Sequence, residues 1–251
     1  MIYFVGAGPG DVDLITVKGR KLLTKADVVI YAGSLVWDQH LHFCPDHCLH
    51  FNSAGMTLEE VGALFREHDG PQKTVIRLHT GDPTLYGAIG EQIALLDDEN
   101  RSYQVIPGVS SFTAASAAIN REFTAPGVSQ TVIVTRMEGK TPVPEGEALE
   151  RLASHRASMA IFLSAQEIDK VVEKLKQGYQ DGKTPVAVVY KASWPDQQIL
   201  FGTLDTIARQ VKEAQITRFA QILVGDFLHD SGERSQLYHP EFSHGFRKGH
   251  T

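Results

Sequence analysis

The chain of 251 residues is long enough for one large domain or two of ordinary size. Hydrophobic residues make up 42% of it, and the formal net charge of −6 disfavours general nucleic-acid binding. The sequence contains no run of about 20 apolar residues, so we expect no membrane span, and the first residues lack the features of a signal peptide. Since the two cysteines are too few for a disulfide framework, we expect a soluble cytoplasmic protein.

The chain opens with a predicted strand, a glycine-rich loop and the start of a helix. Residues 2–5 are apolar and predict a buried strand, which the glycines and proline of residues 6–10 end abruptly. A dinucleotide fingerprint needs its third glycine where Asp11 stands, and a carboxylate there would repel a pyrophosphate. Pro9 also removes a backbone N–H from a phosphate-binding loop. The loop therefore disfavours a phosphate ligand, while a tight turn without any ligand stays open.

Up to about residue 120, apolar strands alternate with helical segments, as in a parallel α/β sheet. Turns rich in glycine or proline end three of these strands, and in such sheets the carboxyl ends of the strands form the ligand crevice. Strands are predicted at residues 2–5, Val28–Tyr31, 74–79 and Tyr103–Ile106. Helices are predicted at Val17–Leu23, after a capping box of Thr57 and Glu60, at 87–96 and at 112–119.

Residues 40–50 hold four histidines and both cysteines. Thiolate and imidazole are good zinc ligands. The segment is nevertheless too short to close a four-ligand finger, and no second cysteine pair exists in the chain. The spacing therefore favours an exposed, histidine-rich connection, and we predict no metal site.

The pattern changes near residue 120. Residues 121–129 predict a linker, so we expect an N-terminal α/β domain (1–120), a C-terminal α/β domain (121–228) and an irregular tail (229–251). The short loop at 193–196 predicts an antiparallel hairpin and hence a mixed second sheet. The strands expected there are 131–135, 159–163, 186–190, Gln198–Thr203 and Ala220–Val224, with helices after a capping box of Ser164 and Glu167 and at 205–214.

Three loop sequences, which occur in the same order as in the family, resemble the signatures of the tetrapyrrole (corrin/porphyrin) methylase superfamily. They are Val-Gly-Ala-Gly-Pro-Gly-Asp at 5–11 with Leu-Ile-Thr at 14–16, His-Thr-Gly-Asp-Pro at 79–83, and Ile-Pro-Gly-Val-Ser-Ser at 106–111. The resemblance implies a class III S-adenosyl-methionine (SAM) methyltransferase fold of two α/β domains, with the active-site cleft and SAM between them. It also implies a homodimer. SAM carries no phosphate, so Pro9 and Asp11 are no obstacle to this interpretation.

Further segments resemble the branch of this superfamily that methylates C-11 of precorrin-4 in cobalamin (vitamin B12) synthesis. That branch would produce precorrin-5 and S-adenosyl-homocysteine (SAH). Open alternatives are cobalt-precorrin-4 as substrate, another activity of the superfamily such as diphthine or ribosomal RNA methylation, and a non-enzymatic SAM- or nucleotide-sensing module. The segments that carry the resemblance are residues 53–56, 131–136 with 138–139, 141–144, 189–195, and 237–240 with 242–245.

Carried over residue by residue, the superfamily's SAM contacts fall on small or backbone-presenting residues. Asp82 is the one formal charge among them, and it would recognise the ribose or the ammonium group of SAM. Its alternative role is an Asx-type turn cap before Pro83. The implied cofactor-binding residues are Pro9, Thr80, Gly81, Asp82, Leu85, Ser110, Ser111, Phe162, Leu163, Ala192 and Ala220.

For the substrate, the resemblance implies Tyr31, Met56 and Arg136 as cleft candidates. Uroporphyrinogen-III methylases carry an Asp just after the second strand, where this chain has Tyr-Ala-Gly-Ser at 31–34. This departure disfavours uroporphyrinogen, and we assign no catalytic residue or proton acceptor. A polycarboxylate substrate needs cations, and those at or near predicted strand ends, each of which also suits a solvated surface, are Arg77, Arg121, Arg136, Lys140 and Lys191.

Overall fold

A computed structural model describes residues 1–229 and 232–249. The chain forms two compact α/β units, which confirms the predicted two-domain α/β architecture. Unit 1 consists of Met1–Ala114 together with Lys191–Asp196, and unit 2 consists of Ala115–Tyr190 and Gln197–Thr251. The division falls inside helix α4 (Ser111–Ala118), before the expected boundary at residue 120. The grouping of Lys191–Asp196 with unit 1 has no counterpart in the sequence pattern.

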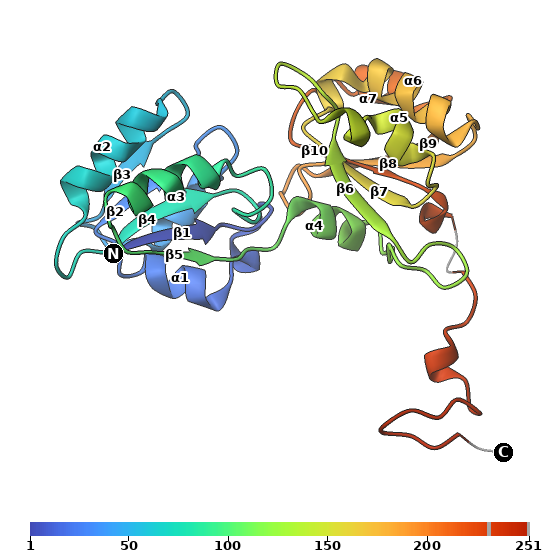
Figure 1. Cartoon of the computed structure of the whole chain (residues 1–251), viewed down its shortest axis with the longest axis horizontal. Helices are drawn as coiled ribbons and strands as arrows, with labels where there is room; N and C mark the ends of the chain where they lie inside the picture. The colour runs from blue at the N-terminus through green and yellow to red at the C-terminus, as the bar shows by residue number, and fades with distance from the viewer. Residues whose placement is uncertain (230–231, 250–251) are drawn as a thin grey trace. The chain divides into compact units, whose positions relative to one another are not determined.

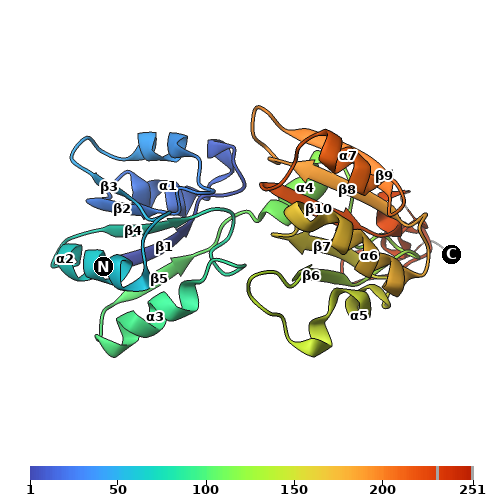
Figure 2. The same cartoon turned by 90° about the horizontal axis from the view of Figure 1, so that it is seen from above.

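Unit 1 contains a fully parallel five-stranded sheet in the order β3-β2-β4-β1-β5. Helix α1 (Val17–Leu23) lies on one face, and α2 (Leu58–His68) and α3 (Ile89–Asp98) lie on the other (Figure 2). Because both faces are covered, the central strands are mostly apolar, and the polar residues of β4, Arg77 and His79, are buried as well. The strands are β1 (Ile2–Gly6), β2 (Val28–Tyr31), β3 (Leu49–Asn52), β4 (Val75–His79) and β5 (Tyr103–Ile106).

The histidine-rich connection differs from its expectation. It contains the 3-10 helix η2 (Asp38–Phe43) and then the edge strand β3, neither of which was expected. His40 and Cys48 are buried, so the segment is not an exposed connection throughout. The sequence pattern does not predict β3, because this edge strand has only four residues and their side chains are mostly exposed, which leaves no apolar run or alternation. The predicted capping box at the start of α2 is confirmed, since Thr57 and Glu60 bond each other's backbone N–H.

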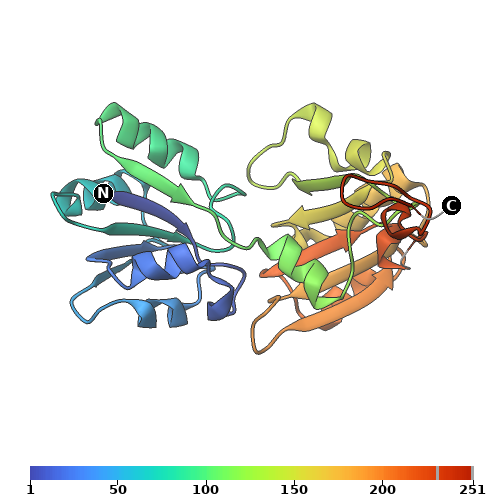
Figure 3. The same ribbon diagram turned by 90° about the horizontal axis from the view of Figure 1, so that it is seen from below.

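Unit 2 contains a mixed five-stranded sheet in the order β6-β7-β10-β8-β9 (Figure 3). β6 and β7 are parallel, whereas β7, β10, β8 and β9 pair antiparallel, and this confirms the predicted hairpin and mixed sheet. The strands are β6 (Val132–Arg136), β7 (Ser158–Phe162), β8 (Pro185–Tyr190), β9 (Gln198–Thr203) and β10 (Ala220–Val224).

Helices α5 (Leu149–Ala153), α6 (Ile168–Tyr179) and α7 (Ile207–Glu213) cover one face of this sheet (Figure 1). The predicted capping box before α6 is wrong. The Ser164 hydroxyl donates to the carbonyl of Phe162 at 2.7 Å and accepts from the N–H of Met137 at 3.0 Å, so it is not available to the helix. The chain first forms the 3-10 turn η4 (Ala165–Glu167), and α6 begins afterwards.

The segment expected to be a linker is packed against unit 2. The Arg121 guanidinium donates to the carbonyls of Leu228 and His229 at 3.1 and 3.0 Å, and the Ser158 hydroxyl donates to that of Phe123 at 2.6 Å. The 3-10 turn η5 (Asp226–Leu228) supplies part of this contact. The described part of the tail includes a short 3-10 turn, η6 (Gln236–Tyr238). Within the described ranges, no helix combines the length and the apolar character needed to cross a membrane.

Candidate cofactor-binding site

Three loops leave the carboxyl ends of the adjacent strands β4, β1 and β5 in unit 1. The backbone joins two of them directly. The N–H of Gly8 donates to the carbonyl of Gly81 at 3.2 Å, and the N–H of Gly81 donates to that of Gly8 at 2.7 Å. This bridge uses only main-chain atoms, and it holds the first two signature loops together.

The third loop touches the other two backbone to backbone. A Cβ added at Gly108 would lie 2.1 Å from the carbonyl oxygen of Gly81 and 2.9 Å from the Cα of Gly6. A Cβ at Gly6 would lie 2.6 Å from the same Gly81 oxygen. Gly81 itself has a φ of +60°, which strains any residue with a side chain. The glycines are therefore needed for the three loops to interlock.

Asp82 links the second loop to the third. Its Oδ1 accepts hydrogen bonds from the N–H and the hydroxyl of Thr84 at 2.8 and 2.5 Å, and its Oδ2 accepts from the N–H of Gly108 at 2.9 Å. The bond to the N–H two residues ahead is the Asx-type turn that was the alternative role. The structure therefore gives Asp82 a positioning role across two loops, and its contact with SAM stays a proposal.

Lys191–Asp196 packs on the first loop. The indole N–H of Trp194 donates to the carbonyl of Pro9 at 2.9 Å, and the N–H of Asp11 donates to the Ser193 hydroxyl at 3.0 Å. Trp194 also stacks on Trp37, with ring centroids 5.0 Å apart. A tryptophan more than 180 residues away thus forms part of the first loop's surroundings, and no local sequence signal indicates this contact.

The structure distributes the predicted cofactor residues unevenly. Pro9, Gly81 and Ser110 lie on the three interlocked loops, and a Cβ on Gly81 would be 3.7 Å from the Cα of Ser110. Leu163 follows β7 with a φ of +54° and is 66% exposed, an unusual backbone conformation for an apolar residue. Unit 1 contains Pro9, Thr80, Gly81, Asp82, Leu85, Ser110, Ser111 and Ala192, whereas unit 2 contains Phe162, Leu163 and Ala220.

The two substrate candidates of unit 1 are connected through Ser53. The carbonyl of Tyr31, at the end of β2, accepts from both the N–H and the hydroxyl of Ser53, at 3.0 and 3.1 Å. The N–H of Met56 then donates to the carbonyl of Ser53 at 3.1 Å. The side chains of Tyr31 and Met56 are half-buried, and their backbones are connected by these hydrogen bonds.

Arg136, the candidate in unit 2, is occupied by its own loop. Its guanidinium donates to the carbonyls of Met137, Thr141 and Pro142 at 3.2, 3.2 and 2.7 Å. The same loop lines a cavity of about 460 Å³. In this cavity Lys174 is paired with Glu138 and Glu150 at 2.9 and 3.0 Å. These contacts give Arg136 a role in holding the loop.

Two other candidate cations are also not solvated surface groups. Arg77 is only 7% exposed, and its guanidinium donates to the Gln92 side chain at 3.0 Å and to the carbonyl of Ile30 at 3.3 Å. Burial lowers the pKa of Arg77 to about 10. Arg121 is bound to main-chain carbonyls, as described above. Lys191 forms an ion pair with Asp196 at 2.5 Å, and Lys140 is exposed.

His79 belongs to the second signature but was not among the predicted site residues. It is 4% exposed at the end of β4, beside Arg77 and the ring of Phe4. Burial, reinforced by the positive charge of Arg77, lowers its pKa to about 3. Its imidazole is therefore neutral near neutral pH. A buried histidine in an apolar run has no sequence signature of its own.

This histidine should make stability depend on pH. Below the ordinary pKa of 6.5 the unfolded chain binds a proton that the folded chain excludes until about pH 3, so stability falls as pH decreases through that window. We expect His79 to lower the free energy of unfolding by about 2 kcal/mol between about pH 7.5 and about pH 5. Urea unfolding at both values should show a smaller difference for His79→Gln than for the native chain. The exposed-site control His42→Gln should keep the native difference, and an unchanged slope in His79→Gln would contradict the assignment.

Comparison with known proteins supports the superfamily resemblance. Residues 1–208 match the family described as Tetrapyrrole (Corrin/Porphyrin) Methylases. A cobalt-precorrin-4 C(11)-methyltransferase of Methanocaldococcus jannaschii is 50% identical, over 99% of this chain and 96% of that protein. A precorrin-4 C(11)-methyltransferase of Mycobacterium tuberculosis is 44% identical, over 97% and 98% of the two chains. The chain therefore belongs to the tetrapyrrole methylases.

Solved structures agree with this membership. A cobalt precorrin-4 methyltransferase, described as a cobalamin biosynthetic enzyme, matches with a TM-score of 0.88 and 45% identity, covering 91% of this chain and 96% of that one. A uroporphyrin-III C-methyltransferase of Thermus thermophilus complexed with SAH matches with a TM-score of 0.74 and 25% identity, covering 90% and 98%. The fold is thus that of SAM-dependent methyltransferases, and one structure of this fold holds the product of SAM.

Proposed function

We propose that this chain is a SAM-dependent C-methyltransferase that methylates C-11 of precorrin-4 in cobalamin biosynthesis and yields precorrin-5. The observation that carries the proposal is the match, over nearly the whole length of both chains, to relatives named for this reaction. The three signature loops are also complete and interlocked in unit 1. A non-enzymatic sensing module would have no need to resemble, over its full length, enzymes that are named for one particular substrate.

The residues at the loops suit SAM. The predicted contacts on unit 1 offer one carboxylate, the hydroxyls of Thr80, Ser110 and Ser111, and main-chain groups, with no cation among them. This donor set fits a cofactor with a positively charged sulfonium and no phosphate, and it would bind a pyrophosphate poorly. Asp82 would fix the arrangement of the second and third loops around the cofactor. The position of the cofactor between the two units stays a prediction of the resemblance.

SAM supplies an activated methyl group when bound, so the protein's task is alignment. Holding two reactants in the reactive geometry can contribute roughly 7–11 kcal/mol toward the barrier. Rigid, backbone-bonded loops suit this task because they need no reorganisation. Precorrin-4 would bring an electron-rich, enamine-like carbon, and a protein nucleophile is then unnecessary. With no carboxylate directly after β2, at residues 31–34, the proton acceptor stays unassigned.

A turnover assay with SAM tests the reaction. We expect the purified protein to add one methyl group to precorrin-4 or to cobalt-precorrin-4, with SAH released in equal amount, as measured by mass spectrometry. The two substrates must be compared side by side because the relatives carry both names. Methylation of uroporphyrinogen III with neither precorrin accepted would overturn the proposal. The homodimer and the cytoplasmic location remain predictions, and the turnover assay does not test them.

A further inference from the structure

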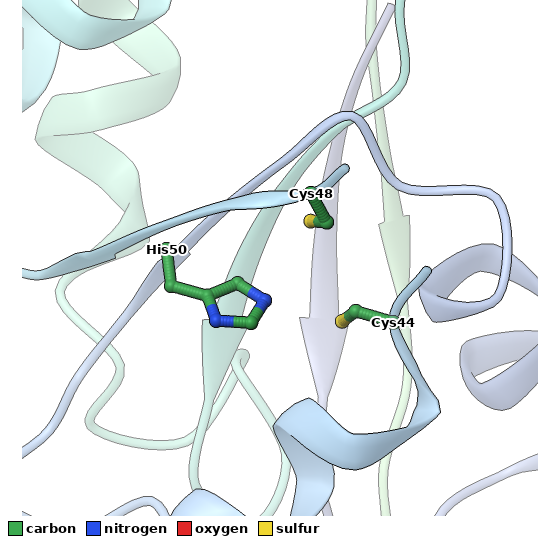
Figure 4. A group of neighbouring side chains, drawn as sticks. All are labelled: Cys44, Cys48 and His50. Carbon is green, nitrogen blue, oxygen red and sulfur yellow. The ribbon is translucent and has the colours of Figure 1, made fainter. Parts of the chain in front are cut away.

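Cys44, Cys48 and His50 converge in unit 1 (Figure 4). One ligand atom from each residue lies within 4.8 Å of the other two. Among the described residues, this is the set of histidines, cysteines and acidic groups whose spacing suits a metal ion. The spacing of these residues cannot close a four-ligand finger, which is why the sequence predicted no metal here. A three-ligand site has no such requirement.

Local backbone structure brings the three side chains together. Cys48 directly precedes β3 and His50 is its second residue, so the two are separated by two positions and project from the same face of the strand. A turn closed by the N–H of Cys48 and the carbonyl of Pro45, at 2.9 Å, folds Cys44 back toward them. Cys44 is itself fixed after η2 by a bond from its N–H to the carbonyl of Leu41 at 3.0 Å.

The chemistry of these groups selects soft or borderline cations. Two sulfurs and one imidazole are preferred ligands of Zn²⁺, and sites with three protein ligands complete their tetrahedron with water. Cys48 is buried, Cys44 is half-buried and His50 is exposed, so one side of the cluster remains accessible. The carboxylate of Asp27 adds negative potential near Cys48.

We propose that Cys44, Cys48 and His50 form a binding site for a thiophilic divalent cation, represented by Zn²⁺, with water as the fourth ligand. Cys48 stands at the amino end of β3, whereas the signature loops leave the carboxyl ends of strands in the same parallel sheet. The cation is therefore structural and takes no part in methyl transfer. It would tie the connection after η2 to β3, a four-residue edge strand that is otherwise mostly exposed.

Zinc titration of the reduced, metal-free protein tests the site without SAM or precorrin, so its result is independent of the proposed function. Competition with a chromophoric chelator should show one Zn²⁺ per chain. Cys44→Ser and His50→Gln should each weaken binding by about 100-fold or more, because one of three direct ligands is lost and even loss of an outer-shell partner costs about 10- to 100-fold. The control His42→Gln changes an exposed histidine of the same segment outside the cluster and should keep native affinity. Co²⁺ in place of Zn²⁺ should show thiolate-to-metal charge transfer that Cys44→Ser diminishes.

Several results would overturn the proposal. Zinc binding that neither Cys44→Ser nor His50→Gln weakens would place the ion elsewhere. Absence of stoichiometric binding by the native chain would remove the site. Thiol trapping at cell lysis supplies an independent test, because a Cys44–Cys48 disulfide in the protein as isolated would assign the pair to redox chemistry. His50→Gln lies at an exposed position, so its folded state is expected to persist and can be checked by circular dichroism.

Discussion

Gly108→Ala should destabilise unit 1 by about 3 kcal/mol and weaken SAH binding at least about tenfold. The new Cβ would lie 2.1 Å from the carbonyl oxygen of Gly81 and 2.9 Å from the Cα of Gly6. Both neighbours are backbone atoms of other signature loops, so no side-chain rotation relieves the clash. One loop must move, and with it the surface that we assign to SAM. Denaturant unfolding and SAH calorimetry measure the two effects separately.

Gly90→Ala is the matched control for this change. Gly90 is the second residue of α3, and a Cβ there would meet nothing within 4 Å. Alanine is favoured over glycine in helices by up to about 1 kcal/mol, so this variant should be as stable as the native chain or slightly more stable. If Gly108→Ala instead matched the native protein both in its resistance to denaturant and in its affinity for SAH, the interlocked loops would be required neither for stability nor for SAH binding.

Asp82→Ala should raise the Kd for SAH roughly thirtyfold, which corresponds to about 2 kcal/mol. The variant removes the acceptor for the N–H of Thr84 and for that of Gly108, at 2.8 and 2.9 Å in the native chain. Without the carboxylate, the second and third loops lose their side-chain link and binding must pay for ordering them. SAH calorimetry measures the change, and circular dichroism verifies that the variant folds.

Asp82→Asn separates the two roles of this carboxylate. The amide oxygen can still accept from Thr84, while the amide NH₂ cannot accept from Gly108 and the negative charge is gone. If Asp82 acts only by positioning the loops, Asn should restore part of the affinity lost in the Ala variant. If the charge also contacts the ammonium of SAM, Asn should bind SAH as weakly as Ala does. Native affinity in Asp82→Ala would contradict both roles.

Most elements could be predicted from the sequence because their signals are local. Strands β1, β2, β4 and β5 of unit 1 are mostly apolar and are followed by turns with glycine or proline, and α6 carries a clear helical stripe that the structure buries. The misses have equally specific causes. β3 is a short edge strand with exposed side chains, so it has neither an apolar run nor an alternating pattern. Ser164 matches a capping box, but its hydroxyl bonds to Phe162 and Met137.

The positions of the loops of the candidate site could be predicted from the sequence, but the contacts between these loops could not. The glycines at 6, 8, 81 and 108 were part of the recognised signatures, but their backbone contacts depend on the parallel order of β4, β1 and β5. Arg77 lies in the middle of β4 and Arg121 follows α4, and neither is free on the surface, because burial depends on what packs around a residue. Sequence alone indicates charge and cannot indicate its partner.

By itself, the sequence determined the two α/β domains, the three glycine loops and their family, because apolar runs and turn residues act through local backbone preferences. Only the tertiary structure decided the grouping of Lys191–Asp196 with unit 1 and the bond from Trp194 to Pro9. It also decided the contact of Asp82 with Gly108. These features arise where separate segments meet, and the contacts made there depend on how the strands and turns pack, which local patterning does not encode.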